Sequence, residues 1–104
     1  MLYIDTPEVL ILMGLGRFNP GQILITPGAQ EALERCGASF AEYLSRHLSG
    51  DWGELDDEDR QSNERSVRGK GMLMSSYRLP SSETIWVKTE YGHEITTILL
   101  PSEY

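Results

Sequence analysis

The residues with the greatest potential for chemistry lie in one stretch, HLSGDWGELDDED, which runs from His47 to Asp59. It places an imidazole, a hydroxyl, carboxylates and an indole around two glycines, a composition common in functional loops. His47 and Asp51 could act as a general base and its orienting carboxylate. Three serines could then supply the nucleophile: Ser49, Ser75 and Ser76. No glycine-flanked nucleophile elbow accompanies them, so a hydrolase or nuclease using His47 and Asp51 is kept as an alternative.

The same stretch could supply nitrogen and oxygen ligands to a divalent metal through His47, Asp51 and the acids that follow. The spacing matches neither a calcium-binding loop nor the zinc-binding helix motif, so we predict no metal and no cofactor. Ordinary turn chemistry explains the loop more simply. Gly50 would end a helix, Asp51 would accept backbone amides, and Trp52 would fill the core below them.

The second part of the stretch is an acidic run without a base. Its six acids are Asp51, Glu54, Asp56, Asp57, Glu58 and Asp59. Such a run is usually a solvated helix terminus. It could instead imitate phosphates and enter the basic groove of a nucleic-acid-binding protein, with Trp52 as an aromatic anchor. On this hypothesis the interaction surface consists of Asp51, Trp52, Glu54, Asp56, Asp57 and Asp59.

Bulk composition favours a protein partner. The 104 residues suit a single domain spanning residues 1–104, and the net charge of -7 disfavours direct binding to nucleic acid while favouring basic proteins. The single cysteine, Cys36, cannot form an internal disulfide, which favours a reducing compartment. With no export signal and no apolar stretch of the roughly 20 residues that a membrane span needs, we expect a cytoplasmic protein.

The elements that would position this stretch are predicted by caps and periodicity. A short strand is expected over residues 22–25. Three helices follow, each with a start signal: Thr26-Pro27 before a helix ending near Cys36, Ser39 with Glu42 before a helix reaching Leu48, and Asp56 or Asp57 before a helix reaching Arg68. The first seventeen residues suit a helix or a strand equally well. They form an N-terminal extension whose secondary structure the sequence does not predict.

From Met72 the apolar pattern changes to a period of two. Three strands are expected, over residues 72–79, 84–90 and 94–100, and the short turns between them require antiparallel neighbours. The predicted class is therefore α+β: an early strand, three short helices, and a three-stranded antiparallel meander forming one sheet packed on the helices. One face of its middle strand would carry Trp86, partly exposed.

Several motifs together suggest a family. They are TPGA at residues 26–29, HLSGDWG at 47–53, YRLP at 77–80, IWV at 85–87 and TTILLP at 96–101. From Phe18 to Tyr104 the chain resembles a family of small uncharacterised bacterial proteins carried on plasmids and other mobile elements. The resemblance implies no catalytic residue. It does imply a role among the small proteins of mobile elements that act against host defences, such as inhibitors of restriction or CRISPR machinery, and antitoxins.

The sequence thus favours a small acidic, non-enzymatic protein of a mobile element that binds and inhibits a basic, nucleic-acid-handling host protein. Two alternatives remain open. One is the small metal-dependent hydrolase or nuclease using His47 and Asp51. The other is a structural homodimer formed through an uncovered sheet face that carries Trp86.

Overall fold

The computed structural model describes the backbone of residues 1–104 and every side chain except those of Glu8, Leu10 and Met13. Its strands are β1 (Leu2–Ile4), β2 (Gln22–Ile25), β3 (Leu73–Arg78), β4 (Thr84–Thr89) and β5 (Ile95–Leu99). Its α-helices are α1 (Pro7–Leu15), α2 (Pro27–Arg35), α3 (Phe40–Leu48) and α4 (Asp57–Gly69). Two 3-10 turns are η1 (Tyr91–His93) and η2 (Pro101–Glu103). The α+β class is therefore confirmed.

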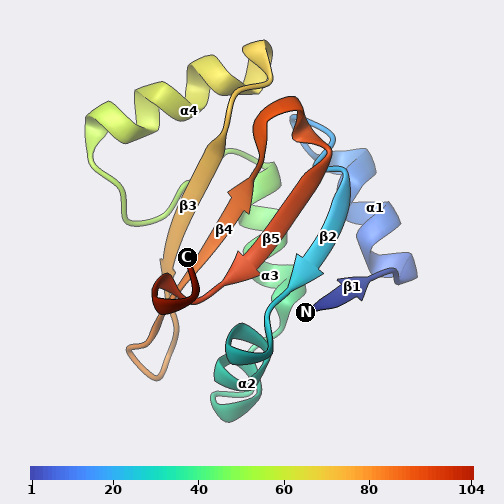
Figure 1. Ribbon diagram of the computed structural model, residues 1–104, viewed down its shortest axis with the longest axis vertical. Helices are drawn as coiled ribbons and strands as arrows, with labels where there is room; N and C mark the ends of the chain where they lie inside the picture. Colours follow the sequence, from blue (N-terminus) through green and yellow to red (C-terminus); the bar gives the residue numbers. More distant parts are fainter.

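The sheet has five strands in the order β1-β2-β5-β4-β3 (Figure 1). The predicted meander is present, since β5 pairs antiparallel with β4 and β4 pairs antiparallel with β3. The expectation that the meander forms the sheet alone was wrong. The early strand β2 pairs parallel with β5, and β1 pairs antiparallel with β2. A parallel neighbour is possible because the chain between β2 and the meander is long enough to cross over one face.

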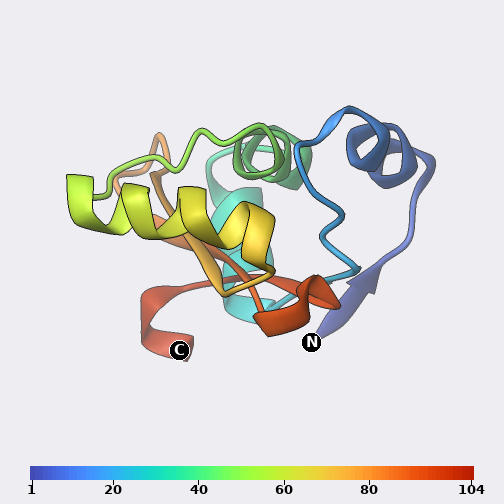
Figure 2. The same cartoon turned by 90° about the horizontal axis from the view of Figure 1, so that it is seen from above.

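The helices α1, α3 and α4 lie on one face of the sheet and leave the opposite face open (Figure 2). Because the helices pack on one face only, burial alternates along β3. Leu73, Ser75 and Tyr77 are buried, and the residues between them are partly exposed. Ala29, Ala32 and Leu33 of α2 join the same core. The first seventeen residues, left open by the sequence, contribute β1 and α1.

Side-chain caps form at the three predicted helix starts, although Ser39 accepts from Ala41 rather than sharing a capping box with Glu42. Thr26 Oγ1 accepts from the amide of Ala29, Ser39 Oγ accepts from the amide of Ala41, and Asp56 Oδ1 accepts from the amide of Asp59. Each bond satisfies an amide that the helix itself leaves unpaired. Lys70, at φ 55°, ends α4 in the left-handed conformation. These local signals explain why the helix boundaries agree closely with those expected from the sequence.

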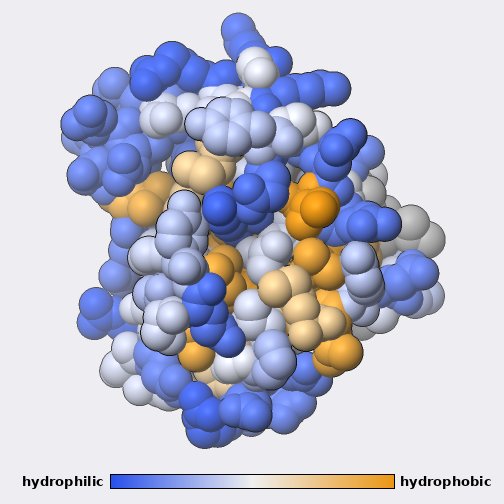
Figure 3. All heavy atoms as spheres, viewed as in Figure 1, coloured by the Kyte–Doolittle hydropathy of each residue, from blue (hydrophilic) through white to orange (hydrophobic). Residues whose placement is uncertain are grey.

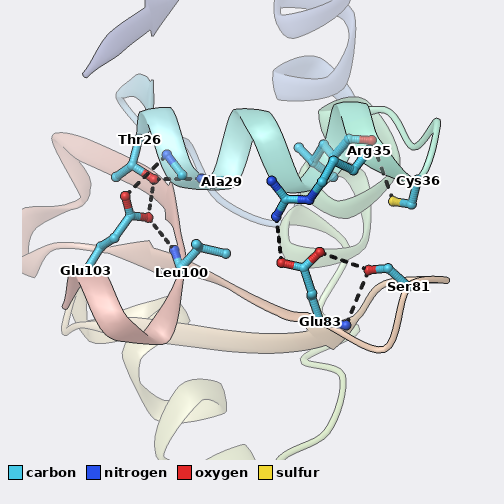
Figure 4. A network of polar contacts seen from close by, with 10 residues as sticks. Thr26, Ala29, Arg35, Cys36, Ser81, Glu83, Leu100 and Glu103 are labelled. Carbon is cyan, nitrogen blue, oxygen red and sulfur yellow. Dashed lines mark hydrogen bonds and ion pairs between the residues drawn. The ribbon is translucent and has the colours of Figure 1, made fainter.

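The residues after β5 are tied to the start of α2 by Glu103 (Figure 4). Its Oε1 accepts from Thr26 Oγ1 (2.5 Å) and from the Leu100 amide (2.8 Å), and its Oε2 accepts from the Gly28 amide (3.3 Å). Partial burial acts to raise the pKa of this carboxyl, but the bonds from Thr26 and the two amides lower it overall. One carboxylate therefore closes the chain end against α2.

Replacing Glu103 with alanine is expected to lower the free energy of unfolding by about 2 kcal/mol, because three donors lose a charged acceptor. Glu83→Ala is the matched control in the same region (Figure 4). Glu83 forms an exposed ion pair with Arg35 at 2.7 Å, which solvent screens, so its loss should cost clearly less than the loss of Glu103. Urea denaturation of both variants measures the difference, and equal losses would contradict this role of Glu103.

Candidate functional site

The acidic run connects α3 to α4 along the outer edge of β3. Gly53 forms a parallel β-bridge with Ser76: the Glu54 amide donates to the Ser76 carbonyl (2.7 Å), and the Ser76 amide donates to the Trp52 carbonyl (3.1 Å). The segment is thus bonded to the edge of the sheet at this one isolated bridge. There it pairs backbone groups of β3 that an open edge would leave unpaired.

The turn before the Gly53 bridge is fixed by Asp51. Its Oδ2 accepts from Arg46 Nε at 2.7 Å, and its Oδ1 accepts from the Gly53 amide at 3.2 Å. The bond from Arg46 lowers the pKa of the Asp51 carboxyl below its usual value, against a smaller opposing effect of burial. The Tyr77 hydroxyl donates to the Asp51 carbonyl at 2.6 Å. Asp51 therefore acts as a turn residue, in agreement with the simpler interpretation of the sequence.

The next acids differ in how they are paired. Glu54 lies 3.5 Å from Arg78 Nη2 in an exposed ion pair, and Asp56 caps α4. Asp57, Glu58 and Asp59 lie exposed in the first turn of α4, and among the described side chains none of the three forms an ion pair. We call Glu54, Asp56, Asp57, Glu58 and Asp59 the acidic edge.

Arg60, the nearest base in the chain, forms no ion pair with the acidic edge among the described side chains. Its Nε donates to the Leu55 carbonyl at 3.0 Å, and its Nη2 donates to the Gly53 carbonyl at 2.8 Å. The guanidinium thus bonds to backbone oxygens and binds α4 to the segment that precedes it. The acidic edge is held from three directions: by β3, by the cap of α4 and by Arg60.

Trp52 fills the core, as the simpler interpretation of the loop expects, and its ring is not on the surface as the aromatic anchor of the interaction hypothesis would require. Its side chain is 4% exposed and packs among Phe18 and His47, with ring centroids 6.5 and 5.6 Å away. Its indole N–H donates to Glu64 Oε2 at 2.9 Å, and Arg17 binds the same carboxylate through two hydrogen bonds. Trp52 points inward because the segment pairs with β3, so that one side of it must face the core.

His47 lies at the centre of a buried polar chain and is completely shielded from solvent. Thr96 Oγ1 donates to the Pro20 carbonyl (2.8 Å), so the Thr96 oxygen must accept from Thr89 Oγ1 (2.7 Å). Thr89 has then used its only proton and must accept from His47 Nε2–H (2.9 Å). By elimination, His47 Nδ1 accepts from the Ser75 hydroxyl (2.5 Å). For a neutral imidazole, the network therefore fixes the tautomer with the proton on Nε2.

Burial lowers the pKa of His47 to about 3, with a smaller contribution from His93. The structure therefore does not bring His47 and Asp51 together as a catalytic pair, because both ring nitrogens are bonded to hydroxyls and the Asp51 carboxylate is bonded elsewhere. The alternative of a hydrolase using these two residues finds no support in this arrangement.

The three candidate serines are also separated. Ser49 Oγ donates to the Arg46 carbonyl at 3.0 Å, and Ser75 belongs to the buried chain. Ser76, the next residue of β3, points to the opposite face of the sheet. Within the part of the chain that the structure describes, no three His, Cys, Asp or Glu side chains are grouped so as to hold a metal ion.

The open sheet face carries Trp86, as expected. Figure 3 shows several apolar patches on this face, separated by hydrophilic residues and bordered by a mainly hydrophilic rim. Trp86 is half-buried because Tyr104 packs against it edge-on at 5.7 Å, and Lys88 Nζ lies 4.5 Å above the Tyr104 ring. In a homodimer through Trp86, the partner would have to contact or displace the Tyr104 ring that packs on Trp86. This homodimer stays a prediction.

Sequence reasoning missed Glu64, Arg17 and the threonines of the buried chain. No local pattern marks them, since each acquires its role from a residue far away in the sequence. None of the helices described is both long and apolar enough to cross a membrane. The chain matches no family model, no curated protein and no solved structure, so the resemblance to proteins of mobile elements stays a prediction.

Proposed function

We propose that this protein is a non-enzymatic cytoplasmic domain that binds a basic, nucleic-acid-handling protein through its acidic edge and thereby inhibits it. One observation carries the proposal. The acidic edge stands on backbone that is bonded to β3 and capped at α4, while Asp57, Glu58 and Asp59 point outward without ion-pair partners among the described side chains. Carboxylates carried on anchored backbone lose less conformational entropy on binding than carboxylates on a mobile loop.

Charge supports the choice of partner. A chain of net charge -7 attracts basic surfaces and repels nucleic acid itself. A nucleic-acid-binding groove is lined with lysine and arginine, and outward carboxylates in a row would occupy the positions of phosphates there. Occupation of the groove would exclude its nucleic acid, so inhibition needs no chemistry from this protein.

The proposal is tested by removing charge without changing shape. The triple variant Asp57→Asn, Glu58→Gln, Asp59→Asn neutralises the three acids of the acidic edge that lie in the first turn of α4 and leaves Glu54 and Asp56 unchanged. The matched control, Glu31→Gln, Glu34→Gln, Glu42→Gln, makes the same change in net charge at exposed acids of α2 and α3. Immobilised wild type, variant and control are exposed to nuclease-treated bacterial lysate, and bound proteins are identified by mass spectrometry.

We expect basic nucleic-acid-binding proteins on the wild type and on the control. Their affinity for the acidic-edge variant should fall at least tenfold, equivalent to about 1.4 kcal/mol. The captured protein, once purified, should lose binding to its nucleic acid when wild type is added. Equal capture by all three chains, or an equal loss in both variants, would contradict the acidic edge as the binding surface. Circular dichroism checks that α4 stays folded.

A further inference from the structure

A cleft of about 880 Å³ lies at the end of the sheet where the chain enters β2 and β5. Three segments that are far apart in the sequence meet around it: the loop before β2, the end of α4, and η1 (Figure 1). Backbone bonds join these segments. The Gly92 amide donates to the Lys70 carbonyl (2.8 Å), and the Gln22 amide donates to the Glu94 carbonyl (2.9 Å). The walls of the cleft are therefore tied to one another.

Basic side chains predominate in this cleft. Among the described residues that line it, Arg17, Arg68 and Lys70 are basic, and Glu94 is the single acid. The excess is local, because the whole chain has 9 basic and 16 acidic residues. We call the space between these four side chains the basic cleft. Its two excess positive charges match the roughly two negative charges of a phosphate monoester at neutral pH.

Two of the bases are available to a ligand. Among the described side chains, Arg68 and Lys70 form no ion pair. Arg17 donates through both Nη atoms to Glu64, which holds its guanidinium in place. The negative end of the α4 dipole accounts for a base in its last turn, such as Arg68, but not for a base contributed by the loop before β2. Bases without a carboxylate partner, gathered from separate segments at one cleft, can bind an external anion.

His93 is a second, independent indication of a ligand. Its ring lines the cleft and is 8% exposed, and its Nε2 lies 2.9 Å from the Gly71 carbonyl oxygen. A carbonyl only accepts, so Nε2 carries a proton and donates it. The other nitrogen, Nδ1, has no hydrogen-bond partner among the described residues and is not shielded from solvent. An unpartnered nitrogen on an otherwise buried ring is a polar group with which a ligand in the cleft can bond.

The backbone at the basic cleft is unusual. Lys70 has φ 55° and His93 has φ 56°, and they are two of the three non-glycine residues with positive φ in the described backbone. Glycine adopts this conformation at no steric cost and is the common residue at the end of a helix, where Lys70 stands. Non-glycine residues in such conformations cluster at ligand-binding sites. Lysine and histidine therefore occupy positions that suit glycine better, and both of them line the same cleft.

The remaining lining suits the organic part of a ligand. Phe18, Val67 and Ile95 contribute apolar surface, and the volume lies within the range of about 300–1,000 Å³ that small-molecule sites occupy. We propose that the basic cleft binds a small phosphorylated molecule, with its phosphate against Arg68 and Lys70 and its apolar part against Phe18. The guanidinium would donate two parallel hydrogen bonds, and the ammonium would add a point charge. A long polyanion is disfavoured because the net charge of -7 repels it.

NMR titration of the full chain with phenyl phosphate tests the proposal, because amide shifts report where the probe binds. We expect saturable shifts in residues 68–71 and 91–94, with a dissociation constant of about 1 mM or less. Inorganic phosphate, which lacks an apolar part, should bind more weakly than phenyl phosphate. The same spectra show whether each variant is folded.

Arg68→Gln and Lys70→Asn should each weaken binding of phenyl phosphate about tenfold. Asparagine is chosen at position 70 because it tolerates the left-handed backbone. Arg65→Gln is the matched control and should leave the affinity unchanged. Arg65 is an exposed base of the same helix, it lies outside the basic cleft, and it forms no ion pair among the described side chains.

Absence of saturable shifts, shifts confined to other parts of the chain, or equal weakening by Arg65→Gln and Arg68→Gln would overturn the site. Equal affinity for inorganic phosphate would overturn an organic ligand. A chain that floats with vesicles containing phosphatidic acid but does not bind phenyl phosphate would overturn the small molecule in favour of a lipid headgroup. The acidic edge lies at the first turn of α4 and the basic cleft at its end, so either proposal can fail alone.

Discussion

Replacing His47 with glutamine is expected to remove most of the pH dependence of stability between about pH 7 and pH 5. In the folded protein burial holds the pKa of His47 at about 3, against 6.5 for an ordinary imidazole. The unfolded chain therefore takes up a proton below pH 6.5 that the folded chain refuses. Stability from this group is fully present above that pH, and it is lost progressively as the pH falls towards the folded pKa.

The loss approaches about 1.4 kcal/mol for each pH unit in this window, or about 2 kcal/mol between pH 7 and pH 5. Urea denaturation at several pH values gives the slope for wild type and for His47→Gln. Ser75→Ala is the control, because it weakens the buried chain and leaves the imidazole in place. That variant should be less stable yet keep the wild-type slope. An unchanged slope in His47→Gln would refute the neutral, enclosed imidazole.

Replacing Gly53 with alanine is expected to lower the free energy of unfolding by more than about 3 kcal/mol and to detach the acidic run from β3. A Cβ at this position would lie 2.0 Å from the Ser76 carbonyl oxygen, which accepts from Glu54 in the bridge. Gly53 also has φ +75°, a conformation that alanine rarely adopts. Backbone must move, and the two bridge bonds are lost with it.

Gly37→Ala separates the two causes. Gly37 has φ +67°, but a Cβ there would meet nothing within 4 Å. This control should lose only about 1 kcal/mol for the left-handed backbone. Thermal and urea denaturation measure both variants. Similar losses would show that the bridge contributes little. On the proposed function, Gly53→Ala should also weaken partner binding although every carboxylate is retained.

Much of this fold follows from local signals. Thr26-Pro27, Ser39 and Asp56 begin the three later helices because each side chain satisfies an amide at a helix start. The meander follows from a period of two in the apolar residues. These features depend on residues a few positions apart, so a single sequence contains them.

The rest depends on residues distant in the chain. No local pattern predicts that β2 pairs with β5, since the paired residues, such as Gln22 and Ile95, are separated by most of the sequence. The same applies to the site. Trp52 has the residue type of an interface anchor, and only the bridge from Gly53 to Ser76 shows that it faces inward. His47 has the residue type of a base, and only the hydroxyls of Ser75 and Thr89 show that it is locked.

The position of β5 has a consequence for biosynthesis. It follows the other strands in the chain, yet in the sheet it lies between β2 and β4. During translation β1 and β2 can pair early, but they cannot join the β3–β4 hairpin until residues 95–99 have left the ribosome tunnel. Pairing between strands so distant in sequence is slow, and unpaired edges expose nascent chains to aggregation. A ribosome stalled before β5 would therefore present two separate half-sheets, so the sheet should be completed in one late step, once residues 95–99 have emerged.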